Sequence, residues 1–360
     1  MKIGIDCRMF GPGFGLARYT QQLVLHLQEI DQKNQYVLFL KSDNWDEVGE
    51  SDNFKKVLAD IPWYSWAEQV NFKSIIKKEK VDLMHFPHWN VPLFYNAPFV
   101  VTIHDLIMYK FPRPEATTLG PVKFWLKDKI HRLLIKHAVK KAKHVIVTSE
   151  FTRQDVHETL GVDLEKMSVT YQAPFKSGTN SEIQNLEDKK YVLYVGAAYP
   201  HKNLDRLLQA WNLLQEKTGE YRLLLAGKEN YFYKRLEEKI ENAQNVRYLG
   251  FVSDEKLVEL YKNASLYSFP SMYEGFGIPP LEAQQNGVPV VSSNASCLPE
   301  VLGESALYFD PENIEQMAEI IEKGLLDEDV RRELKQNARE NLKRFSSKRL
   351  AEKTLSIYKK

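Results

Sequence analysis

The sequence predicts an α/β protein built from two doubly wound domains, each on a parallel sheet. Short apolar runs alternate with segments of helical periodicity through most of the 360 residues, and this alternation is typical of parallel sheets with helices on both faces. A polar stretch at residues 176–188 has almost nothing to bury, and the alternation restarts after it. The length suits two domains of ordinary size, each with its own core.

The N-terminal domain is expected to span residues 1–176. Its first strand leads into a glycine-rich turn and then into a helical pattern from Ala17 to Gln28. The predicted strands of this domain are residues 2–6, 36–40, 82–86, 99–104, 144–149 and 167–171.

The C-terminal domain is expected at residues 190–345, after a linker at 177–189. Its predicted strands are residues 191–196, 221–226, 246–249, 265–269, 288–292 and 306–309, and helical patterns cover 203–215, 314–326 and 330–345. Residues 346–360 place Leu350, Ala351, Thr354, Leu355 and Tyr358 on one stripe, so they should pack as a further helix.

The composition excludes several classes of protein. Lys and Arg total 49 against 48 Asp and Glu, which gives no overall bias toward nucleic acid. Cys7 and Cys297 lie too far apart for a disulfide framework or a CxxC metal pair. Asp6 and Arg8 interrupt the first apolar run, so it reads as a strand rather than a signal peptide. We therefore expect a cytoplasmic protein without a metal or cofactor, either free or peripheral on the inner face of the membrane.

The stretch from Phe269 to Ala283 predicts a strand, a glycine loop and a helix that starts at Pro279-Pro280. Backbone N–H groups around Gly275 and Gly277, together with the helix N-terminus, favour an anion. The carboxylates Glu274 and Glu282 would repel a bare phosphate, but they can accept hydrogen bonds from sugar hydroxyls beside a diphosphate. The alternative is an ordinary strand-turn-helix whose first-turn acid complements the helix dipole.

Three further features fall at predicted strand ends. Gly11 to Gly15 follow the first strand with the spacing G-x-G-x-G, which suits contact with a phosphate or sugar but lacks the dinucleotide fingerprint. His104-Asp105 ends the strand at 99–104, where Asp105 either contributes to a site or only caps a turn. Lys202 lies near the start of a helix and can reach a diphosphate oxygen, or it is a solvated surface lysine.

Two charged segments have alternative interpretations. Residues 121–145 carry eight basic side chains and one acidic side chain among apolar residues, which is typical of a helix on an anionic membrane or of a core helix with a solvated basic face. Asp327-Glu328-Asp329 lies between two helical patterns, so it is interpreted as helix capping rather than a metal–diphosphate site.

Taken together, these motifs resemble glycosyltransferase family 4. Glu274 and Glu282 form the E-x7-E signature of retaining enzymes with the GT-B fold. The glycine loop near Gly15, His104-Asp105 and Lys202-Asn203 occur in the family's order. The resemblance covers nearly the whole chain and implies two Rossmann-like domains that face each other across a cleft, with the C-terminal helix returning to the N-terminal domain. It also implies that the domain at 1–176 lies on the acceptor side and that the domain at 190–345 binds the nucleotide sugar.

The resemblance also implies roles for individual residues. Glu274 would contact the donor sugar, with the amides of Gly275, Phe276 and Gly277 nearby, and Glu282 would hold the ribose hydroxyls. Lys202 would bind the diphosphate, Gly15 would let the first loop approach the phosphates, and His104 would lie beside the reacting carbon. Ala197 and Ala198 stand where many members carry an arginine, so neutralisation of the diphosphate would depend on Lys202 and backbone amides.

The implied reaction is transfer of a hexose, mannose or glucose, from a GDP- or UDP-sugar to a glycan or lipid-linked acceptor in cell-surface polysaccharide assembly. Since the second carboxylate is assigned to ribose, no protein nucleophile is evident, and we expect front-face substitution with retention. A nucleotide-sugar epimerase on the same architecture is the main alternative. A nicotinamide dehydrogenase and a catalytically silent binding protein are weaker ones.

Overall fold

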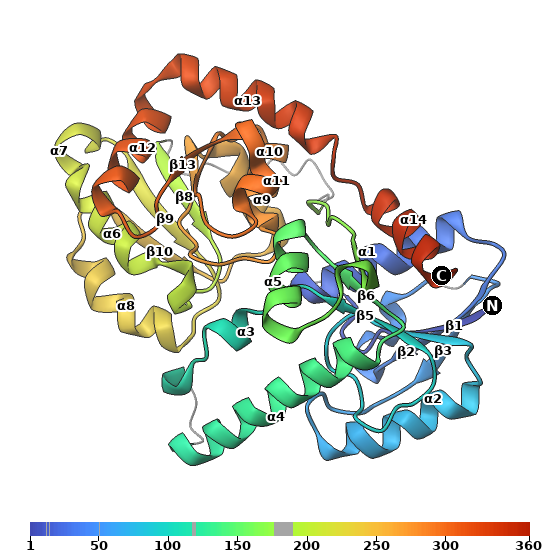
Figure 1. Cartoon of the computed structure of the whole chain (residues 1–360). Helices are drawn as coiled ribbons and strands as arrows, with labels where there is room; N and C mark the ends of the chain where they lie inside the picture. The colour runs from blue at the N-terminus through green and yellow to red at the C-terminus, as the bar shows by residue number, and fades with distance from the viewer. Residues whose placement is uncertain (12, 14, 50, 117–119, 176–189) are drawn as a thin grey trace. The chain divides into compact units, whose positions relative to one another are not determined.

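The computed structural model describes residues 1–360 apart from 12, 14, 50, 117–119 and 176–189, and the chain forms two compact units (Figure 1). Unit 1 contains Met1–Gln172 together with Ser346–Lys360, and unit 2 contains Ala173–Phe345. The predicted linker at 177–189 lies outside the described residues.

Unit 1 is built on a seven-stranded parallel sheet with the order β3-β2-β1-β4-β5-β6-β7. The strands are β1 (Lys2–Asp6), β2 (Gln35–Leu40), β3 (Phe54–Leu58), β4 (Leu83–Phe86), β5 (Phe99–Ile103), β6 (His144–Val147) and β7 (Met167–Val169). β1 pairs with both β2 and β4, as Ile3 lies opposite Tyr36 on one side and Leu83 on the other. The order therefore reverses between β1 and β4, as in doubly wound sheets.

Helices cover both faces of this sheet (Figure 1). They are α1 (Gly15–Ile30), α2 (Lys73–Glu79), α3 (Ile107–Lys110), α4 (Gly120–Lys141), α5 (Glu150–Leu160) and α14 (Ser347–Tyr358). Alternate residues of β2 point to opposite cores: Leu38 packs with α1 and α14, whereas Phe39 packs with α2 and α4. The period of two follows from the pleat of a strand that is buried on both faces.

The last helix returns to unit 1, as the family resemblance implies. α14 packs beside α1, with the red end of the chain against the blue beginning in Figure 1. It starts at Ser346, whose hydroxyl accepts a hydrogen bond from the Arg349 amide, and its Tyr358 hydroxyl lies 2.6 Å from His85 Nδ1 on β4. Residues that are 273 positions apart thus share one buried hydrogen bond.

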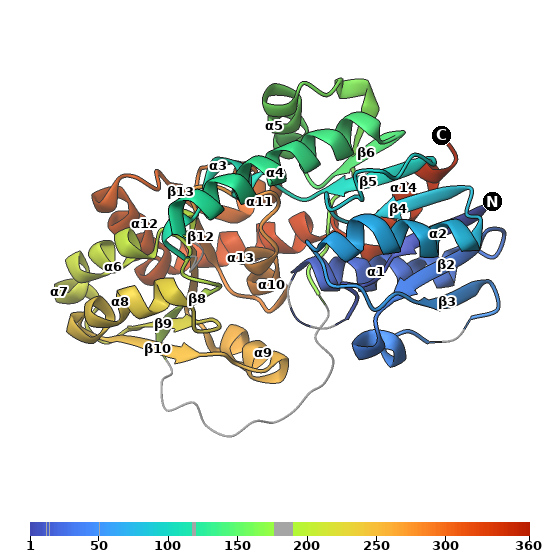
Figure 2. The same ribbon diagram turned by 90° about the horizontal axis from the view of Figure 1, so that it is seen from below.

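Unit 2 is built on a six-stranded parallel sheet with the order β10-β9-β8-β11-β12-β13. The strands are β8 (Tyr191–Val195), β9 (Arg222–Ala226), β10 (Val246–Gly250), β11 (Leu266–Phe269), β12 (Val290–Ser293) and β13 (Ala306–Phe309). Figures 1 and 2 show β8, β9 and β10 running side by side. Here the order reverses between β8 and β11.

The helices of unit 2 lie mostly between successive strands. They are α6 (Leu204–Leu213), α7 (Gln215–Thr218), α8 (Tyr231–Asn242), α9 (Asp254–Asn263), α10 (Ile278–Gln285), α11 (Leu298–Leu302), α12 (Ile314–Leu326) and α13 (Glu328–Leu342). Trp211 of α6, Leu236 of α8 and Ile321 of α12 meet Val192 and Leu223 of the sheet in one core. None of the helices described in either unit combines the length and apolar composition needed to span a bilayer.

The architecture confirms the predicted fold class, with one strand that the sequence did not predict. β3 reads Phe-Lys-Lys-Val-Leu and forms the edge of the unit 1 sheet, paired only with β2 among the described strands. Lysines on an edge strand block pairing with other chains. The same lysines interrupt the apolar run by which a strand is found in a sequence.

Candidate functional site

The strongest candidate site in unit 2 lies where β8 and β11 end. These strands flank the point at which the strand order of the sheet reverses, and open α/β sheets bind ligands beside the carboxyl ends of strands at such points. The segment after β8 carries Lys202, and the loop after β11 carries Glu274. The sequence-predicted residues of these two loops are therefore brought together.

Lys202 is fixed by a short turn before α6. Pro200–Lys202 form a single 3-10 turn, and Asn203 follows in the left-handed region with φ +62°. The Asn203 side-chain amide donates to the carbonyls of Pro270, at 3.2 Å, and Pro311, at 2.7 Å. Asn tolerates this backbone better than most residues and has two amide hydrogens to donate. It therefore joins the lysine turn to the loop after β11.

Glu274 and Lys202 form an ion pair. Lys202 Nζ lies 2.5 Å from Glu274 Oε1, and the side chains are 18% and 9% exposed. The Glu274 amide donates to Ser296 Oγ at 3.0 Å, and the amide of Met272 donates to the carbonyl of His201 at 2.7 Å. Both charged side chains are thus held on an ordered backbone, and the ammonium group remains partly accessible.

The glycine loop between Glu274 and α10 has the backbone that the sequence predicted. Gly277 precedes the helix with φ +90°, and a Cβ there would lie 2.8 Å from Leu298 Cδ2, so both conformation and space require glycine. Pro279 and Pro280 occupy the first turn of α10, as expected. Because prolines lack an N–H group, the backbone N–H groups at this helix start belong to Gly275, Phe276, Gly277 and Ile278.

Phe276 enters the core through its side chain. It is 4% exposed, and its ring packs edge-on against Phe345 with centroids 5.6 Å apart. Its contribution to a ligand site is therefore limited to the backbone, which is the role that the resemblance implies.

Glu282 is the fifth of the eight residues of α10 and lies among buried tyrosines. The Tyr261 hydroxyl donates to Glu282 Oε2 at 3.2 Å. Burial raises the pKa of Tyr261 and of Tyr267, and the Glu282 charge raises both further. Both phenols therefore stay neutral, and Tyr261 orients a carboxylate that remains partly exposed.

Sequence reasoning placed Gly196 at the end of a predicted strand but missed its close contact with Gly227. Gly196 and Gly227 follow β8 and β9, and a Cβ on Gly227 would lie 2.1 Å from the carbonyl oxygen of Gly196. The Gly196 carbonyl also accepts a hydrogen bond from the Tyr233 hydroxyl at 2.8 Å. The available signal was that Gly227 directly follows the predicted strand at 221–226. The close contact of Gly227 with Gly196 positions the start of the segment that leads to Lys202.

In unit 1, His104 follows β5 and is surrounded by protein groups. Its Nε2 lies 2.9 Å from the Pro87 carbonyl, its Nδ1 lies 3.2 Å from Gln172 Nε2, and the Tyr19 ring packs edge-on at 4.6 Å. Since a carbonyl only accepts, Nε2 carries the proton and Nδ1 accepts from the Gln172 amide. Burial lowers the pKa of His104 to about 4, so a neutral ring is held in one orientation.

Asp105 acts as a turn cap, which was the simpler of its two interpretations. Its Oδ1 accepts a hydrogen bond from the Ile107 amide at 2.8 Å, at the start of α3.

Gly15 is the first residue of α1, and it is exposed with nothing within 4 Å of an added Cβ. In the preceding loop, Gly11 and Gly13 adopt positive φ, +128° and +125°. The backbone conformation of the loop therefore requires glycine at positions 11 and 13. At position 15 the protein itself does not require glycine, and only the close approach of a ligand would. Gly15 and His104 belong to unit 1, and the other predicted site residues belong to unit 2.

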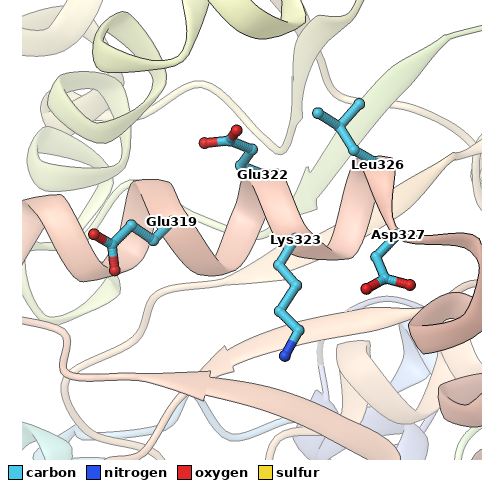
Figure 3. Close-up of a pocket in the computed structure, with 5 residues that line it drawn as sticks. All are labelled: Glu319, Glu322, Lys323, Leu326 and Asp327. Atoms are coloured by element: carbon cyan, nitrogen blue, oxygen red, sulfur yellow. The ribbon is translucent and has the colours of Figure 1, made fainter.

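A surface hollow on α12 contains none of the predicted residues. It has a volume of about 430 Å³ and is lined by Glu319, Glu322, Lys323, Leu326 and Asp327 (Figure 3). Asp327 caps α13 by accepting a hydrogen bond from the Val330 amide at 3.0 Å. The Asp327-Glu328-Asp329 motif is thus a helix cap, as predicted.

Two family models match the chain, one in each half. The model described as Glycosyltransferase Family 4 matches residues 15–173, and the one described as Glycosyl transferases group 1 matches residues 177–341. Together they cover most of both units.

Relatives and solved structures agree with these matches. The chain is 28% identical to the O-antigen chain mannosyltransferase RfbU of Salmonella typhimurium over 87% of this chain and 91% of the relative. It is also 28% identical to O-antigen chain mannosyltransferase B of Escherichia coli over 97% and 96%. The sucrose-phosphate synthase of Thermosynechococcus elongatus has the same fold, with a TM-score of 0.76 at 19% identity over 99% of this chain and 98% of the other. The chain belongs to the family 4 glycosyltransferases and has their GT-B fold.

Proposed function

We propose that this glycosyltransferase is a retaining hexosyltransferase that uses a nucleotide-diphosphate sugar, GDP-mannose or another GDP- or UDP-hexose. The observation that carries the proposal is the Lys202–Glu274 pair beside the Gly275–Gly277 loop, where β8 and β11 end. Both relatives named above are mannosyltransferases, which favours mannose as the sugar.

The two sides of the pair suit the two ends of such a donor. Lys202 supplies a cation for the diphosphate, and the amides of Gly275, Phe276 and Gly277 are fixed donors for the charge that develops as the phosphate leaves. Glu274 accepts hydrogen bonds from hydroxyls of the sugar, and Glu282 from those of the ribose. Donor binding then exchanges one of the Lys202 contacts with Glu274 for contacts with phosphate oxygens.

The proposed reaction is front-face substitution. The bond between the anomeric carbon and the diphosphate oxygen breaks, while an acceptor hydroxyl oxygen bonds to the same carbon from the same face. The acceptor proton passes to the departing diphosphate, so no protein nucleophile is needed. The proposed acceptor is a glycan or a lipid-linked glycan, and the proposed role of His104 is to position the sugar through a neutral ring.

A thermal-shift panel of GDP-mannose, UDP-glucose and other nucleotide sugars tests the donor class. A ligand at 100 times its dissociation constant adds about 2.7 kcal/mol to the free energy of unfolding. We expect stabilisation by at least one nucleotide sugar and none by NADH. Transfer from that donor to a saccharide, with the anomeric configuration read by NMR, then tests retention. Conversion of the donor without an acceptor would instead indicate an epimerase.

We also propose that α4 contacts an anionic membrane surface, where lipid-linked acceptors reside. Its outward residues include large exposed apolar side chains, namely Val122, Trp125, Leu126, Ile130 and Leu133. Exposed lysines stand among them, and Lys129 Nζ lies 5.7 Å from the Trp125 ring centroid. Apolar and basic side chains on one face suit a helix that lies in the headgroup region.

A further inference from the structure

A second cluster of side chains lies where the strand order of the unit 1 sheet reverses, and the function proposed above does not use it. The reversal falls between β1 and β4, and a ligand is expected beside the carboxyl ends of such strands. His88 and Trp89 lie in the loop after β4, Tyr64 lies in the segment between β3 and α2, and His131 lies on α4. We call these four residues the aromatic cluster.

The aromatic cluster is centred on Trp89. Its ring lies 5.4 Å from that of Tyr64, 4.7 Å from that of His88 and 4.4 Å from that of His131, measured between centroids. Trp89 also packs against the core of unit 1, whereas Tyr64 is 56% exposed. One side of the cluster is therefore anchored in the protein, and the Tyr64 side is open to a ligand.

A buried carboxylate holds the open side in place. Glu68 accepts hydrogen bonds at 2.6 Å from both Arg8, which follows β1, and Asn90, which follows Trp89. Its second oxygen accepts from the Tyr64 amide at 2.8 Å, and Tyr64 has φ +59°. A left-handed backbone at a bulky residue is uncommon and gathers at ligand sites. Glu68 thus connects the segments that follow β1 and β4 with the backbone of Tyr64, and it holds these segments in place without a ligand.

The charges around the cluster exclude an anion as its ligand. The Arg8 side chain is buried and paired with both Asp6 and Glu68, so its positive charge is already compensated by protein carboxyl groups. Burial raises the pKa of Glu68, and Arg8 opposes that shift. Burial, with smaller contributions from His104 and His131, lowers the pKa of His88 to about 3, so the ring is neutral. Among the described residues, His88 Nδ1 and His131 Nε2 have no hydrogen-bond partner. The site therefore offers aromatic faces and neutral polar atoms.

We infer that the aromatic cluster binds a pyranose ring of the acceptor, with Tyr64 and Trp89 as the stacking surface. One face of a pyranose presents C–H groups, which pack on aromatic rings, and its hydroxyls suit neutral polar atoms and the nearby carboxylate. A phosphate is disfavoured here by Asp6 and Glu68, whereas in unit 2 it has Lys202. This inference rests on the proposed function, because only that function makes the bound sugar an acceptor.

The test is saturation-transfer NMR on the full chain without donor, with methyl α-mannoside and α-mannobiose as probes and myo-inositol as a polyol control. Irradiation of aromatic protons should transfer signal to C–H protons of the two saccharides and not to inositol. Tyr64→Ala should abolish the signal and Tyr64→Phe should keep it. Tyr64→Asn, whose side chain tolerates the left-handed backbone, repeats the loss if the alanine variant does not fold. Val70→Ala changes an exposed apolar residue of the neighbouring segment and should change nothing.

Each other result overturns the inference. Signal that survives Tyr64→Ala and Tyr64→Asn excludes the tyrosine. Signal that is lost in Tyr64→Phe assigns binding to the hydroxyl and excludes stacking. If the wild-type protein gives no saccharide signal, the aromatic cluster is not a sugar subsite, even if nucleotide sugars stabilise the protein. If the saccharide signal is present but no nucleotide sugar binds, the proposed function is wrong and the subsite remains. In a transfer assay, Tyr64→Ala should raise the acceptor KM about tenfold at unchanged donor KM.

Discussion

Glu274 and Lys202 show how one contact can serve two states of a site. In this structure they form an ion pair at 2.5 Å, with the Glu274 side chain 9% exposed. The carboxylate is thus oriented without a ligand, and the ammonium group is held beside the glycine loop. Such preorganisation reduces the reorganisation that charge development would otherwise require.

We expect Glu274→Ala to lower the rate of sugar transfer by about 10²- to 10³-fold, in the range seen when a fixed transition-state partner is removed. Lys202 is left partly accessible to solvent, so the protein should remain folded, with a melting temperature near that of the wild type. Activity is measured as nucleotide release in the presence of acceptor. Asp329→Ala, at a side chain 89% exposed on α13, is the control. Full activity in Glu274→Ala would remove this carboxylate from the site.

Two glycine substitutions should separate structural from ligand-related roles. Gly277→Ala forces a Cβ against Leu298 at φ +90°, so we expect a loss of about 1–3 kcal/mol in the free energy of unfolding. Gly15→Ala meets no atom within 4 Å at the start of α1, so stability should stay the same or rise by up to about 1 kcal/mol. If the first loop approaches the donor phosphates, Gly15→Ala should still raise the donor KM. Urea unfolding and donor titration give the two readouts, and an unchanged donor KM would exclude that approach.

Among the elements, α14 is notable because a buried hydrogen bond joins it to β4. The Tyr358 hydroxyl bonds His85 Nδ1, while His85 Nε2 lies 2.8 Å from Thr102 Oγ1 on β5. Leu350, Ala351 and Ile357 add apolar contacts to the same core. The helix therefore belongs to the core of unit 1, although it lies at the opposite end of the sequence.

Two substitutions at Tyr358 should measure that attachment. Tyr358→Phe leaves a buried His85 nitrogen without its partner, which costs about 1–3 kcal/mol. Tyr358→Ala also leaves a cavity, and the total should reach about 3–5 kcal/mol. Unfolding followed by denaturant titration gives both values. A loss in Tyr358→Phe equal to that in Tyr358→Ala would show that the hydrogen bond, and not packing, fixes the helix.

α4 is the element whose proposed partner is a lipid surface. We expect the protein to co-sediment with vesicles that contain phosphatidylglycerol and much less with vesicles of phosphatidylcholine alone, because lysines near an anionic surface gain about 1 kcal/mol each. Replacing Leu126 and Leu133 together by serine should weaken the association. Leu213→Ser, at a similarly exposed leucine of α6, is the matched control, and equal binding by both variants would argue against α4.

At the scale of the whole molecule, unit 1 should lose stability in acid. Burial lowers the pKa of His85 and His88 to about 3 and that of His104 to about 4, and all three lie in unit 1. Their folded pKa values lie below the unfolded value of about 6.5. Between these limits the unfolded state binds more protons, so stability falls as pH falls.

We therefore expect the melting temperature of unit 1 to decrease from about pH 6.5 downward. Each of these histidines contributes a slope of about 1.4 kcal/mol per pH unit. Calorimetry at pH 7, 6 and 5 measures the decrease, and His85→Gln should reduce the slope by one histidine whatever its effect on the stability at pH 7. A slope that does not change in that variant would assign the acid response to other groups.

The sequence was sufficient for the fold and for the residues that rest on backbone chemistry. Short apolar runs in the sequence predicted every strand described in the structure except β3. The two lysines of β3 interrupt its apolar run, so the sequence pattern does not reveal it. Gly277 and the Pro279-Pro280 pair were predicted because glycine and proline restrict the backbone locally. The positions of Gly227, Glu68 and Ser296 relative to the sites depend on contacts between segments far apart in the sequence, and no local pattern encodes such contacts.

The return of α14 to unit 1 also has a consequence for synthesis. Residues 1–172 are synthesised first. The core of unit 1 around His85 and α1 remains incomplete until residues 346–360, which form α14, have been synthesised and can pack against it. Unit 2 needs no later segment, so it can become complete while the older half of the polypeptide still exposes part of its interior. A chain truncated after Phe345 would thus display an unfinished first unit and a finished second one, and chaperones would contact it mainly through unit 1.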